Sequence, residues 1–324
     1  MDVILPVAGL GSRLRPQTWS RPKPLLGLAG KPILEHVLDE VMPLRPEKLV
    51  FITGYLGDQV EAWARATYDL ELAFVEQPEM RGQTDAILRV KDHAKKDGLI
   101  LFPDMVFAAE FERIASSNAD VVIFTKDVAD PSAFGIAVEE GGLVVKLVEK
   151  PQDPISRNAL VGIYYVRSMP DLYSAIEEQM ERGIMLKNEY FLADAVQIMV
   201  DRGAKVVTAP VTVWEDCGSV PNLLSTNRFV LDRDRPAPPK FETATVIAPS
   251  YVDATATVER SVIGPYASIG AHAVIRNAVL SDVIIEPGAV VDGIVARESL
   301  VGVKAQVTGR VAILNVGDNS GVAL

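Results

Sequence analysis

A glycine-rich segment near the amino terminus combines close backbone approach with positive charge. In VILPVAGLGSRLRPQTWSRPKPLLGLAGKP, an apolar run leads into Gly9 and Gly11. From Gly9 to Lys31 there are five basic residues and no acidic one, although the whole chain has a formal net charge of −11. The N–H groups of such a turn can form a nest for an anion, which nearby cations neutralise. The segment therefore predicts phosphate chemistry.

Two familiar phosphate-binding motifs fit this segment poorly. The run from Gly9 to Gly11 has the first half of a dinucleotide-binding fingerprint, but Leu14 stands in place of its third glycine. The GLAGK run that ends at Lys31 is similar to part of a P-loop, but Pro32 follows the lysine in place of Ser or Thr. A purely structural turn would explain the glycines but not the cations around them.

The same segment resembles the signature of an enzyme family. AGLGSRLRPQT followed by RPKPL is similar to the loop of the sugar-phosphate nucleotidylyltransferases, which is G-x-G-x-R-L-x-P-x-T and then P-K-P-L. In that family the loop wraps a triphosphate, with the arginine on the phosphates and the lysine bridging the reacting groups. The resemblance assigns these roles to Arg13 and Lys23. It also predicts nucleotide binding by the loop residues Gly9, Leu10, Gly11 and Ser12.

A second segment resembles the part of these enzymes that reads the nucleobase. It contains EQP, with Gln77 at its centre, and then Gly82. A glutamine at this position suits the amide-like edge of uracil or thymine. Gln83 and Thr84 depart from the family's G-T-A-D-A pattern, so the sequence leaves the base preference open.

Two aspartates stand where the family binds a metal ion. Asp104 follows the apolar run LILFP at the end of a predicted strand, where ligand sites lie in open α/β sheets. Asp216 belongs to WEDCGS, which resembles the family's W-x-D-x-G-T element. The resemblance predicts Mg²⁺ at both carboxylates, a ligand type that this ion prefers. Without that context Asp104 could equally be a turn residue. We expect no nucleophile role for Cys217, because no histidine is placed to activate it.

Three further segments resemble elements that hold the sugar phosphate. FG at 134–135 and VEKP at 148–151 match the family's Y-G and V-E-K-P elements, and NEYFLAD at 188–194 follows its G-E-Y-x-L-T-D pattern with two substitutions. The resemblance implies that Lys150 binds the phosphate, that Glu149 accepts hydrogen bonds from sugar hydroxyls, and that Glu189 contacts the sugar. The remaining predicted substrate-binding residues are Gly135, Gly162 and Trp214.

The resemblance implies a reaction in which a nucleoside triphosphate and a sugar 1-phosphate give an NDP-sugar and pyrophosphate. The sugar phosphate is itself the nucleophile, so catalysis is expected to be positioning and charge stabilisation. Glucose 1-phosphate with dTTP or UTP is the favoured pair. Mannose 1-phosphate with GTP is the alternative, because guanylyl-transferring members also carry a C-terminal β-helix. A non-catalytic sensor of sugar nucleotides would be expected to lack one of four residues that are all present here: Arg13, Lys23, Asp104 and Asp216.

The elements that must position these residues form an α/β pattern in the first part of the chain. From Asp2 to about Val213, short Val- and Ile-rich runs predict buried strands, with helix-period segments such as Pro32 to Met42 between them. This alternation predicts an α/β domain over 1–231 with a doubly wound, mostly parallel sheet of Rossmann-like type. The predicted strands are VILPV, KLVFIT, LAFV, LILF, VVIFT, LVVKLVE and LVGIYYV.

A linker and a repetitive domain are predicted next. DRDRPAPP, which begins at Asp232, is rich in charge and proline, so we assign 232–243 to a linker. Beyond it apolar residues recur every six positions, which is typical of a hexapeptide left-handed β-helix of roughly four coils over 244–324. A β-sandwich is disfavoured because its strands have a period of two. The recurring residues are Val246, Val252, Val258, Ile263, Ile269, Ile275, Val301, Val307 and Ile313.

The β-helix has two candidate roles. A stack of coils ends in exposed edges that another subunit can cover, so we expect it to be an assembly element of a homo-oligomer. Hexapeptide β-helices also occur in acyltransferases, in which His272 would be a candidate base. No acidic residue lies near it in sequence to support that role.

The composition is that of a globular protein of roughly two domains. Of its 324 residues, 48% are hydrophobic and 23% are charged. The net charge of −11 argues against a broad nucleic-acid or anionic-membrane surface, and no apolar run of about 18 residues predicts a membrane span. The single cysteine and three scattered histidines argue against a disulfide framework and a multi-cysteine zinc site, so we expect a cytoplasmic protein.

Overall fold

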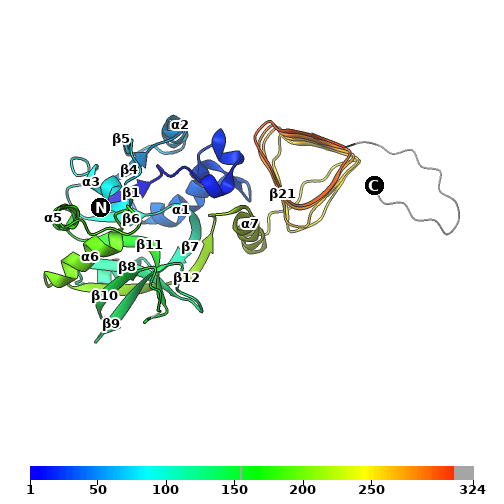
Figure 1. Ribbon diagram of the computed structural model, residues 1–324. Helices are drawn as coiled ribbons and strands as arrows, with labels where there is room; N and C mark the ends of the chain where they lie inside the picture. The colour runs from blue at the N-terminus through cyan, green and yellow to red at the C-terminus, as the bar shows by residue number, and fades with distance from the viewer. Residues whose placement is uncertain (154, 310–324) are drawn as a thin grey trace. The chain divides into compact units, whose positions relative to one another are not determined.

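The structure, a computed structural model, describes residues 1–153 and 155–309. The chain divides into two compact units. One consists of Met1–Leu26 and Lys31–Asn222, and the other consists of Gly27–Gly30 and Leu223–Leu324. Each unit is described separately below (Figure 1).

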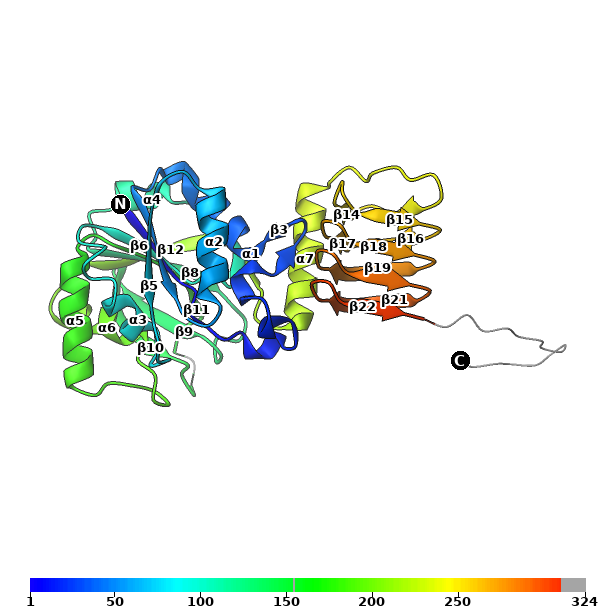
Figure 2. The same ribbon diagram turned by 90° about the horizontal axis from the view of Figure 1, so that it is seen from above.

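The first unit is built on a large mixed sheet (Figures 1 and 2). Its strands are β1 (Asp2–Pro6), β4 (Lys48–Thr53), β5 (Glu71–Glu76), β6 (Gly98–Leu101), β7 (Met105–Ala109), β8 (Val121–Asp127), β9 (Gly135–Glu140), β10 (Leu143–Glu149), β11 (Asn158–Val166) and β12 (Val206–Asp216). The main order is β5-β4-β1-β6-β11-β8-β12-β7, and β9 joins β10 to β11. The strands β5, β4, β1 and β6 are parallel to one another, as is the pair β8 and β12.

The predicted α/β sheet is confirmed, and all seven predicted strands are present. The antiparallel part was not predicted. β11 runs antiparallel to β6, β8 and β9, and β12 runs antiparallel to β7. Parallel neighbours need a long crossover connection. The chain from β8 to β11 instead turns back on itself through the β9-β10 pair, with no helix between these strands.

Helices cover both faces of this sheet, as Figure 2 shows. They are α1 (Ile33–Val41), α2 (Gly57–Thr67), α3 (Gln83–Leu88), α4 (Glu112–Ser116), α5 (Met169–Glu181) and α6 (Leu192–Asp201). Alternate side chains of β1 enter different cores. Val3 and Leu5 pack in a cluster with residues of α1 and α2, whereas Ile4 packs in a cluster with residues of α3, α5 and α6. The doubly wound arrangement therefore follows from the period-two pattern of the strands, and the helix predicted from Pro32 to Met42 is α1.

The second unit contains a parallel β-helix. Its strands are β13 (Thr245–Val246), β14 (Tyr251–Val252), β15 (Thr257–Glu259), β16 (Val262–Ile263), β17 (Ala267–Ile269), β18 (Val274–Arg276), β19 (Val279–Ile285), β20 (Val290–Asp292), β21 (Val295–Val301) and β22 (Gln306–Thr308). Every strand pairs in parallel with its equivalent in the next coil. Figure 1 shows these coils end-on as a triangle, and Figure 2 shows them from the side as a stack.

The length of one coil explains why the six-residue period shifts phase along the sequence. The register pairs Thr245 with Val262, Val262 with Val279, and Val279 with Val295, so one coil takes 17 or 16 residues. Three complete hexapeptides would take about 18. Each coil therefore omits one or two residues at a corner, and the apolar side chains still point inward: Val258, Ile263, Ile269 and Ile275 are all buried.

The second unit also contains α7 (Val220–Asp234) from Leu223 onward, and the strand β2 (Gly27–Leu28). The strand β3 (Lys31–Pro32) belongs to the first unit. The helix α7 runs to Asp234, so the first residues of the segment predicted as a linker are helical, whereas 235–240 has no regular secondary structure. The predicted repeat residue Ile313 lies outside the described residues.

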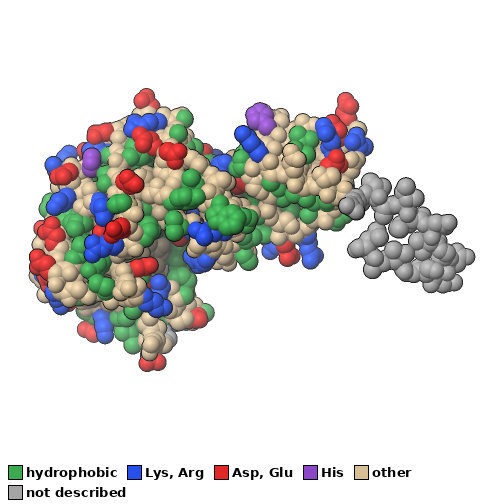
Figure 3. All heavy atoms as spheres, turned by 45° about the horizontal axis from the view of Figure 1, so that its top comes forward, with side chains coloured by type: hydrophobic (Ala, Val, Ile, Leu, Met, Phe, Trp, Pro, Cys, Tyr) green, Lys and Arg blue, Asp and Glu red, His purple; other side chains and the backbone are tan. Residues whose placement is uncertain are grey.

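Charged side chains of both signs are mixed over the face of the first unit seen in Figure 3. None of the helices in the described part of the chain is long and apolar enough to span a membrane.

Candidate functional site

Two cavities of the first unit lie at the carboxyl ends of its parallel strands. The first is lined by 6–9 and 11–13 at and after the end of β1, by Gln77 and neighbouring residues after β5, and by 102–104 after β6. The second is lined by residues around Phe134, by the end of β10, by the middle of β11 and by the end of β12. Four residues line both cavities, which therefore form one connected site: Arg13, Gln83, Phe102 and Asp104.

The glycine-rich loop is closed on itself. The carbonyl of Gly11 accepts hydrogen bonds from Leu14 N at 2.9 Å and from Thr18 Oγ1 at 2.9 Å. Gly11 has a φ of 59°, and a Cβ at this position would lie 3.0 Å from the Cβ of Lys23. Glycine is therefore needed both for the left-handed backbone and for the close approach of the lysine. The loop places five predicted residues on the first cavity: Gly9, Gly11, Ser12, Arg13 and Lys23.

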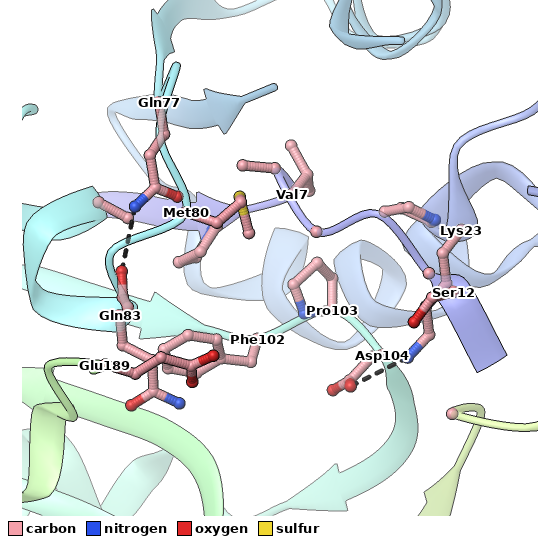
Figure 4. A pocket seen from close by; sticks show the side chains of 18 of the residues that line it. Val7, Ser12, Lys23, Gln77, Met80, Gln83, Phe102, Pro103, Asp104 and Glu189 are labelled. Atoms are coloured by element: carbon pink, nitrogen blue, oxygen red, sulfur yellow. Dashed lines mark hydrogen bonds and ion pairs between the residues drawn. The ribbon is translucent and has the colours of Figure 1, made fainter. Parts of the chain in front are cut away.

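An ion pair joins this loop to the turn after β6. Lys23 Nζ donates a hydrogen bond of 3.0 Å to Asp104 Oδ2 (Figure 4). The side chain of Lys23 is only 12% exposed, whereas that of Asp104 is 48% exposed. The lysine is therefore held against the cavity wall, and the carboxylate remains open to an incoming cation.

Strand pairing brings the two predicted metal-binding aspartates together. The β7-β12 register pairs Met105 with Asp216, and Cys217 N donates to the carbonyl of Asp104 at 2.9 Å. The Asp216 carboxylate accepts hydrogen bonds from Gly218 N at 3.0 Å and from the Asn222 side chain. These two bonds fix the direction of the carboxylate. Cys217 is fully buried.

Arg13 lies close to Asp216. A Cβ at Gly218 would lie 2.9 Å from Asp216 Oδ1 and 3.0 Å from Arg13 Nη2, so both charged groups approach the same glycine. Two cations from the glycine-rich segment, Arg13 and Lys23, thus stand beside two carboxylates from the opposite wall. Such an arrangement can hold phosphate groups together with a metal ion.

The donor set of the two aspartates fits Mg²⁺. No group of three or more His, Cys, Asp or Glu side chains that could hold a metal occurs among the described residues. Mg²⁺ does not need such a cage, because it keeps several waters and commonly binds one or two carboxylates together with substrate phosphates. Asp104 and Asp216 both face the second cavity and supply oxygen ligands only.

The region predicted to read a base lies at the other end of the first cavity. Gln77 follows β5 and is 4% exposed, and its side chain lines the cavity together with Met80, Gly82 and Gln83. Gly82 has a φ of 109°, and a Cβ there would overlap the backbone of Tyr190. This close approach connects the segment that follows β5 to the turn that carries Glu189.

The region predicted to hold the sugar phosphate lies in the second cavity. Gly135 and Glu149 are cross-strand partners in the β9-β10 pair, and a Cβ at Gly135 would lie 2.7 Å from Glu149 Oε2. Burial raises the pKa of Glu149, and the ammonium of Lys150, 3.5 Å away, acts in the opposite direction. Lys150 Nζ also lies 4.9 Å from the ring centroid of Phe191, a favourable cation–π contact.

Other predicted residues form the walls. Gly162, with a φ of 95°, lies where the β8-β11 register shifts, and its carbonyl accepts a hydrogen bond from Phe102 N at 3.1 Å. Trp214 packs on Phe134 with ring centroids 4.8 Å apart. Glu189 lines the first cavity. The irregular backbone at Gly162 thus brings Phe102 to the point where the two cavities meet.

The structure brings together all but one of the predicted site residues. Only Leu10 lines neither cavity, and this residue is 45% exposed. Sequence reasoning missed Phe102 and Asn222, and it noted Gln83 only as a departure from a pattern. Phe102 lies two residues before the predicted Asp104, so its position near a motif was the available signal.

Comparison with known proteins gives a consistent assignment. A family model described as nucleotidyl transferase matches residues 2–233. The bifunctional protein GlmU of Methanocaldococcus jannaschii is 31% identical over 237 residues, which are 72% of this chain and 55% of that protein. The chain thus spans about half the length of that relative. A glucose-1-phosphate thymidylyltransferase of Streptomyces griseus is 25% identical over 354 aligned positions, which cover 99% of this chain and 98% of that protein.

Two further comparisons each cover about two thirds or more of the chain. A UTP–glucose-1-phosphate uridylyltransferase of Haloferax volcanii is 28% identical over 224 residues, which are 66% of this chain and 89% of that protein. A solved structure of UDP-glucose pyrophosphorylase complexed with UDP-glucose has a TM-score of 0.59 at 21% identity, over 72% of this chain and 98% of that chain. The latter likeness shows a shared fold.

Proposed function

The chain belongs to the nucleotidyl transferase family, and we propose that it is a sugar-1-phosphate nucleotidylyltransferase. The substrates would be a nucleoside triphosphate and a sugar 1-phosphate, and the products an NDP-sugar and pyrophosphate. The observation that carries this proposal is the meeting of Arg13, Lys23 and two aspartates between two connected cavities. One cavity suits a nucleotide and the other suits a sugar phosphate.

In the proposed reaction an oxygen of the sugar phosphate attacks the α-phosphorus of the nucleotide in line. A new P–O bond forms, the bond to the bridging oxygen breaks, and its electron pair leaves with pyrophosphate. The reaction needs no enzyme nucleophile, so the residues act by holding and neutralising the phosphates. Arg13 and the loop N–H groups would hold the triphosphate, and Lys23 would stabilise charge that develops between the two reacting groups.

Members of the family generally depend on a divalent metal, and we propose Mg²⁺ for this chain. Asp104 and Asp216 would hold it, since their carboxylates face the same cavity. When bound, the ion would supply positive charge that offsets the negative charge developing on the phosphates. Asn222 and Gly218, which hydrogen-bond to Asp216, would keep that carboxylate oriented.

Glucose 1-phosphate with dTTP or UTP is the proposed substrate pair. The names of the S. griseus and H. volcanii relatives support it, as does the carboxamide of Gln77 in the wall of the first cavity. In the second cavity, Lys150 would bind the phosphate of the sugar, and Glu149 would accept hydrogen bonds from its hydroxyls.

The reverse reaction provides a direct experiment. Incubation with UDP-glucose, pyrophosphate and Mg²⁺ should produce UTP and glucose 1-phosphate, which phosphorus NMR resolves. Release of UMP or free phosphate in place of UTP would indicate a hydrolase and would contradict the proposal.

We also propose that the β-helix supports assembly into a homo-oligomer and that the enzyme acts in the cytoplasm. The parallel strands of the β-helix offer edges that a second subunit can cover. The single cysteine, Cys217, suits a reducing compartment. Sedimentation equilibrium of the full chain gives the subunit number, and cell fractionation gives the compartment.

A further inference from the structure

The amide orientation of Gln77 is fixed by two hydrogen bonds. Its Nε2 donates to the carbonyl of Gly82 at 3.1 Å and to Asp85 Oδ2 at 3.0 Å. A primary amide nitrogen has two hydrogens, so both are used within the protein. The two acceptors also determine which way the amide points, because a carbonyl and a carboxylate cannot donate to the Gln77 oxygen.

The carboxylate that holds Gln77 is itself held in place. Asp85 lies in α3, is 6% exposed, and accepts a hydrogen bond of 3.1 Å from Nε of Arg89, one helical turn later. The Arg89 guanidinium carries only donors, and this charge-assisted contact restrains the Asp85 carboxylate. The connected groups are thus Arg89, Asp85 and Gln77, in that order toward the cavity.

The remaining polar atom of Gln77, Oε1, is presented to the first cavity. Figure 4 shows this oxygen on the opposite side of the amide from the bond to Gly82, toward Val7 and Met80. Among the described residues none donates a hydrogen bond to it. The cavity therefore offers a hydrogen-bond acceptor at this point, with no donor from the same side chain.

We propose that Asp85 is a positioning residue that makes the site select bases with a ring N–H. This inference rests on the proposed function, since it names the class of base that the nucleotide carries. Uracil and thymine present N3–H, which can donate to Gln77 Oε1. Cytosine presents an unprotonated ring nitrogen, which would face the oxygen as a second acceptor. One missing hydrogen bond and one repulsive contact to a buried group together predict about 10-fold to 100-fold discrimination.

The experiment measures equilibrium binding without turnover. Isothermal titration of the full chain with UTP and with CTP, in Mg²⁺ and without sugar phosphate, gives the ratio of the two dissociation constants. These nucleotides differ only at the edge of the base. The wild-type protein is expected to bind UTP about 10-fold to 100-fold more tightly than CTP.

The variant Asp85→Ala tests the positioning role. Without the carboxylate, Nε2 keeps only the Gly82 carbonyl, and the amide can rotate to offer a donor to cytosine. We expect the CTP-to-UTP ratio of dissociation constants to fall to within about 3-fold of unity, and Asp85→Asn, which can keep an oxygen in place, to restore most of it. The matched control is Glu61→Gln, which removes a similar i,i+4 pair with Arg65 on an exposed helix face. It should leave the ratio unchanged.

A double-mutant cycle separates positioning from folding. In a Gln77→Ala background, Asp85→Ala should leave the ratio unchanged, because its effect passes through Gln77. A general loss of fold would weaken UTP and CTP binding equally, and circular dichroism would report it. An unchanged ratio in Asp85→Ala would overturn the proposal, as would a further change of the ratio in the Gln77→Ala background.

The outcomes also separate this inference from the proposed function. Equal binding of UTP and CTP by the wild type would overturn the inference and leave the proposed reaction intact. Selective UTP binding with no reaction toward any sugar 1-phosphate would overturn the proposed function alone. Failure of UTP to bind at all would contradict both.

Discussion

Lys23 Nζ lies 3.0 Å from Asp104 Oδ2, although the two residues are 81 positions apart in the sequence. The contact joins the glycine-rich segment, which carries the cations, to the strand end that carries a predicted metal ligand. A largely buried ammonium beside a half-exposed carboxylate is an arrangement that a metal–triphosphate complex can enter.

The aspartates are expected to be essential for turnover. Asp104→Asn and Asp216→Asn each replace an anionic metal ligand with a neutral one of the same size, so kcat should fall by about 100-fold or more. Steady-state kinetics with saturating Mg²⁺ measures this effect. Asp127→Asn, which removes an exposed carboxylate paired with Arg157, is the matched control and should retain wild-type kcat. Normal turnover in either site variant would remove the metal assignment.

The lysine of the loop is expected to act on the transition state. Lys23→Met keeps the length of the side chain but removes its charge, and kcat should fall by about 100-fold with a smaller change in the KM for nucleotide. Lys31→Met is the control, because Lys31 is an exposed lysine of the same segment that pairs with Asp39. A pure rise in KM for Lys23→Met would show that the lysine contributes only to ground-state binding.

Gly82 is expected to tolerate no side chain. Gly82→Ala would combine a positive φ with overlap against the Tyr190 backbone, and should lower the free energy of unfolding by about 2 kcal/mol or more. The nucleotide KM should rise as well. Gly141→Ala separates the two causes, because Gly141 has a φ of 58° with no atom within 4 Å of its Cβ position. Chemical denaturation should show a smaller loss of unfolding free energy for Gly141→Ala than for Gly82→Ala. Equal losses would show that the overlap with the Tyr190 backbone contributes little.

The pH dependence of sugar-phosphate binding should reflect Glu149. Burial raises the pKa of this carboxyl, so it becomes protonated at a higher pH than an exposed glutamate as pH falls. A protonated Glu149 accepts hydrogen bonds less well, and the KM for sugar 1-phosphate should therefore rise on the acidic side of neutrality. The phosphate of the substrate titrates in the same range.

The variant Glu149→Gln separates the titration of the protein from that of the substrate phosphate. Glu149→Gln cannot titrate, so its KM should be higher at neutral pH but should change less between about pH 5 and 7 than that of the wild type. The same raised pKa means that ionised Glu149 costs folding stability at neutral pH. This cost in folding stability should disappear as the pH falls below the range in which an exposed glutamate titrates. Parallel KM–pH profiles in the two proteins would exclude Glu149 from the sugar site.

Much of the phosphate-binding region could be predicted because its residues are close together in sequence. The loop can close only if its residues lie in one segment, as Gly11, Arg13 and Lys23 do. A linear motif is therefore enough to indicate their arrangement. The strands and the β-helix were predictable for the same reason: their burial patterns repeat within a few residues.

Contacts between distant segments could not be predicted in the same way. The antiparallel course of β11 depends on how the β9-β10 pair folds back, and the shared wall at Phe102 depends on the irregular backbone at Gly162. Two side-chain hydrogen bonds within short segments were also missed, because no sequence pattern pairs Asn222 with Asp216 or Gln77 with Asp85. Leu10 was included because it lies within the motif, although it lines neither cavity.

The most direct test of the central claim is the release of pyrophosphate from a panel of nucleoside triphosphates, each combined with several sugar 1-phosphates. The account predicts release that requires Mg²⁺ and both substrates, with UTP or dTTP and glucose 1-phosphate giving the highest kcat/KM. Turnover with GTP and mannose 1-phosphate alone would contradict the proposed substrate pair. Absence of sugar-dependent pyrophosphate release from every combination would contradict the proposed reaction itself.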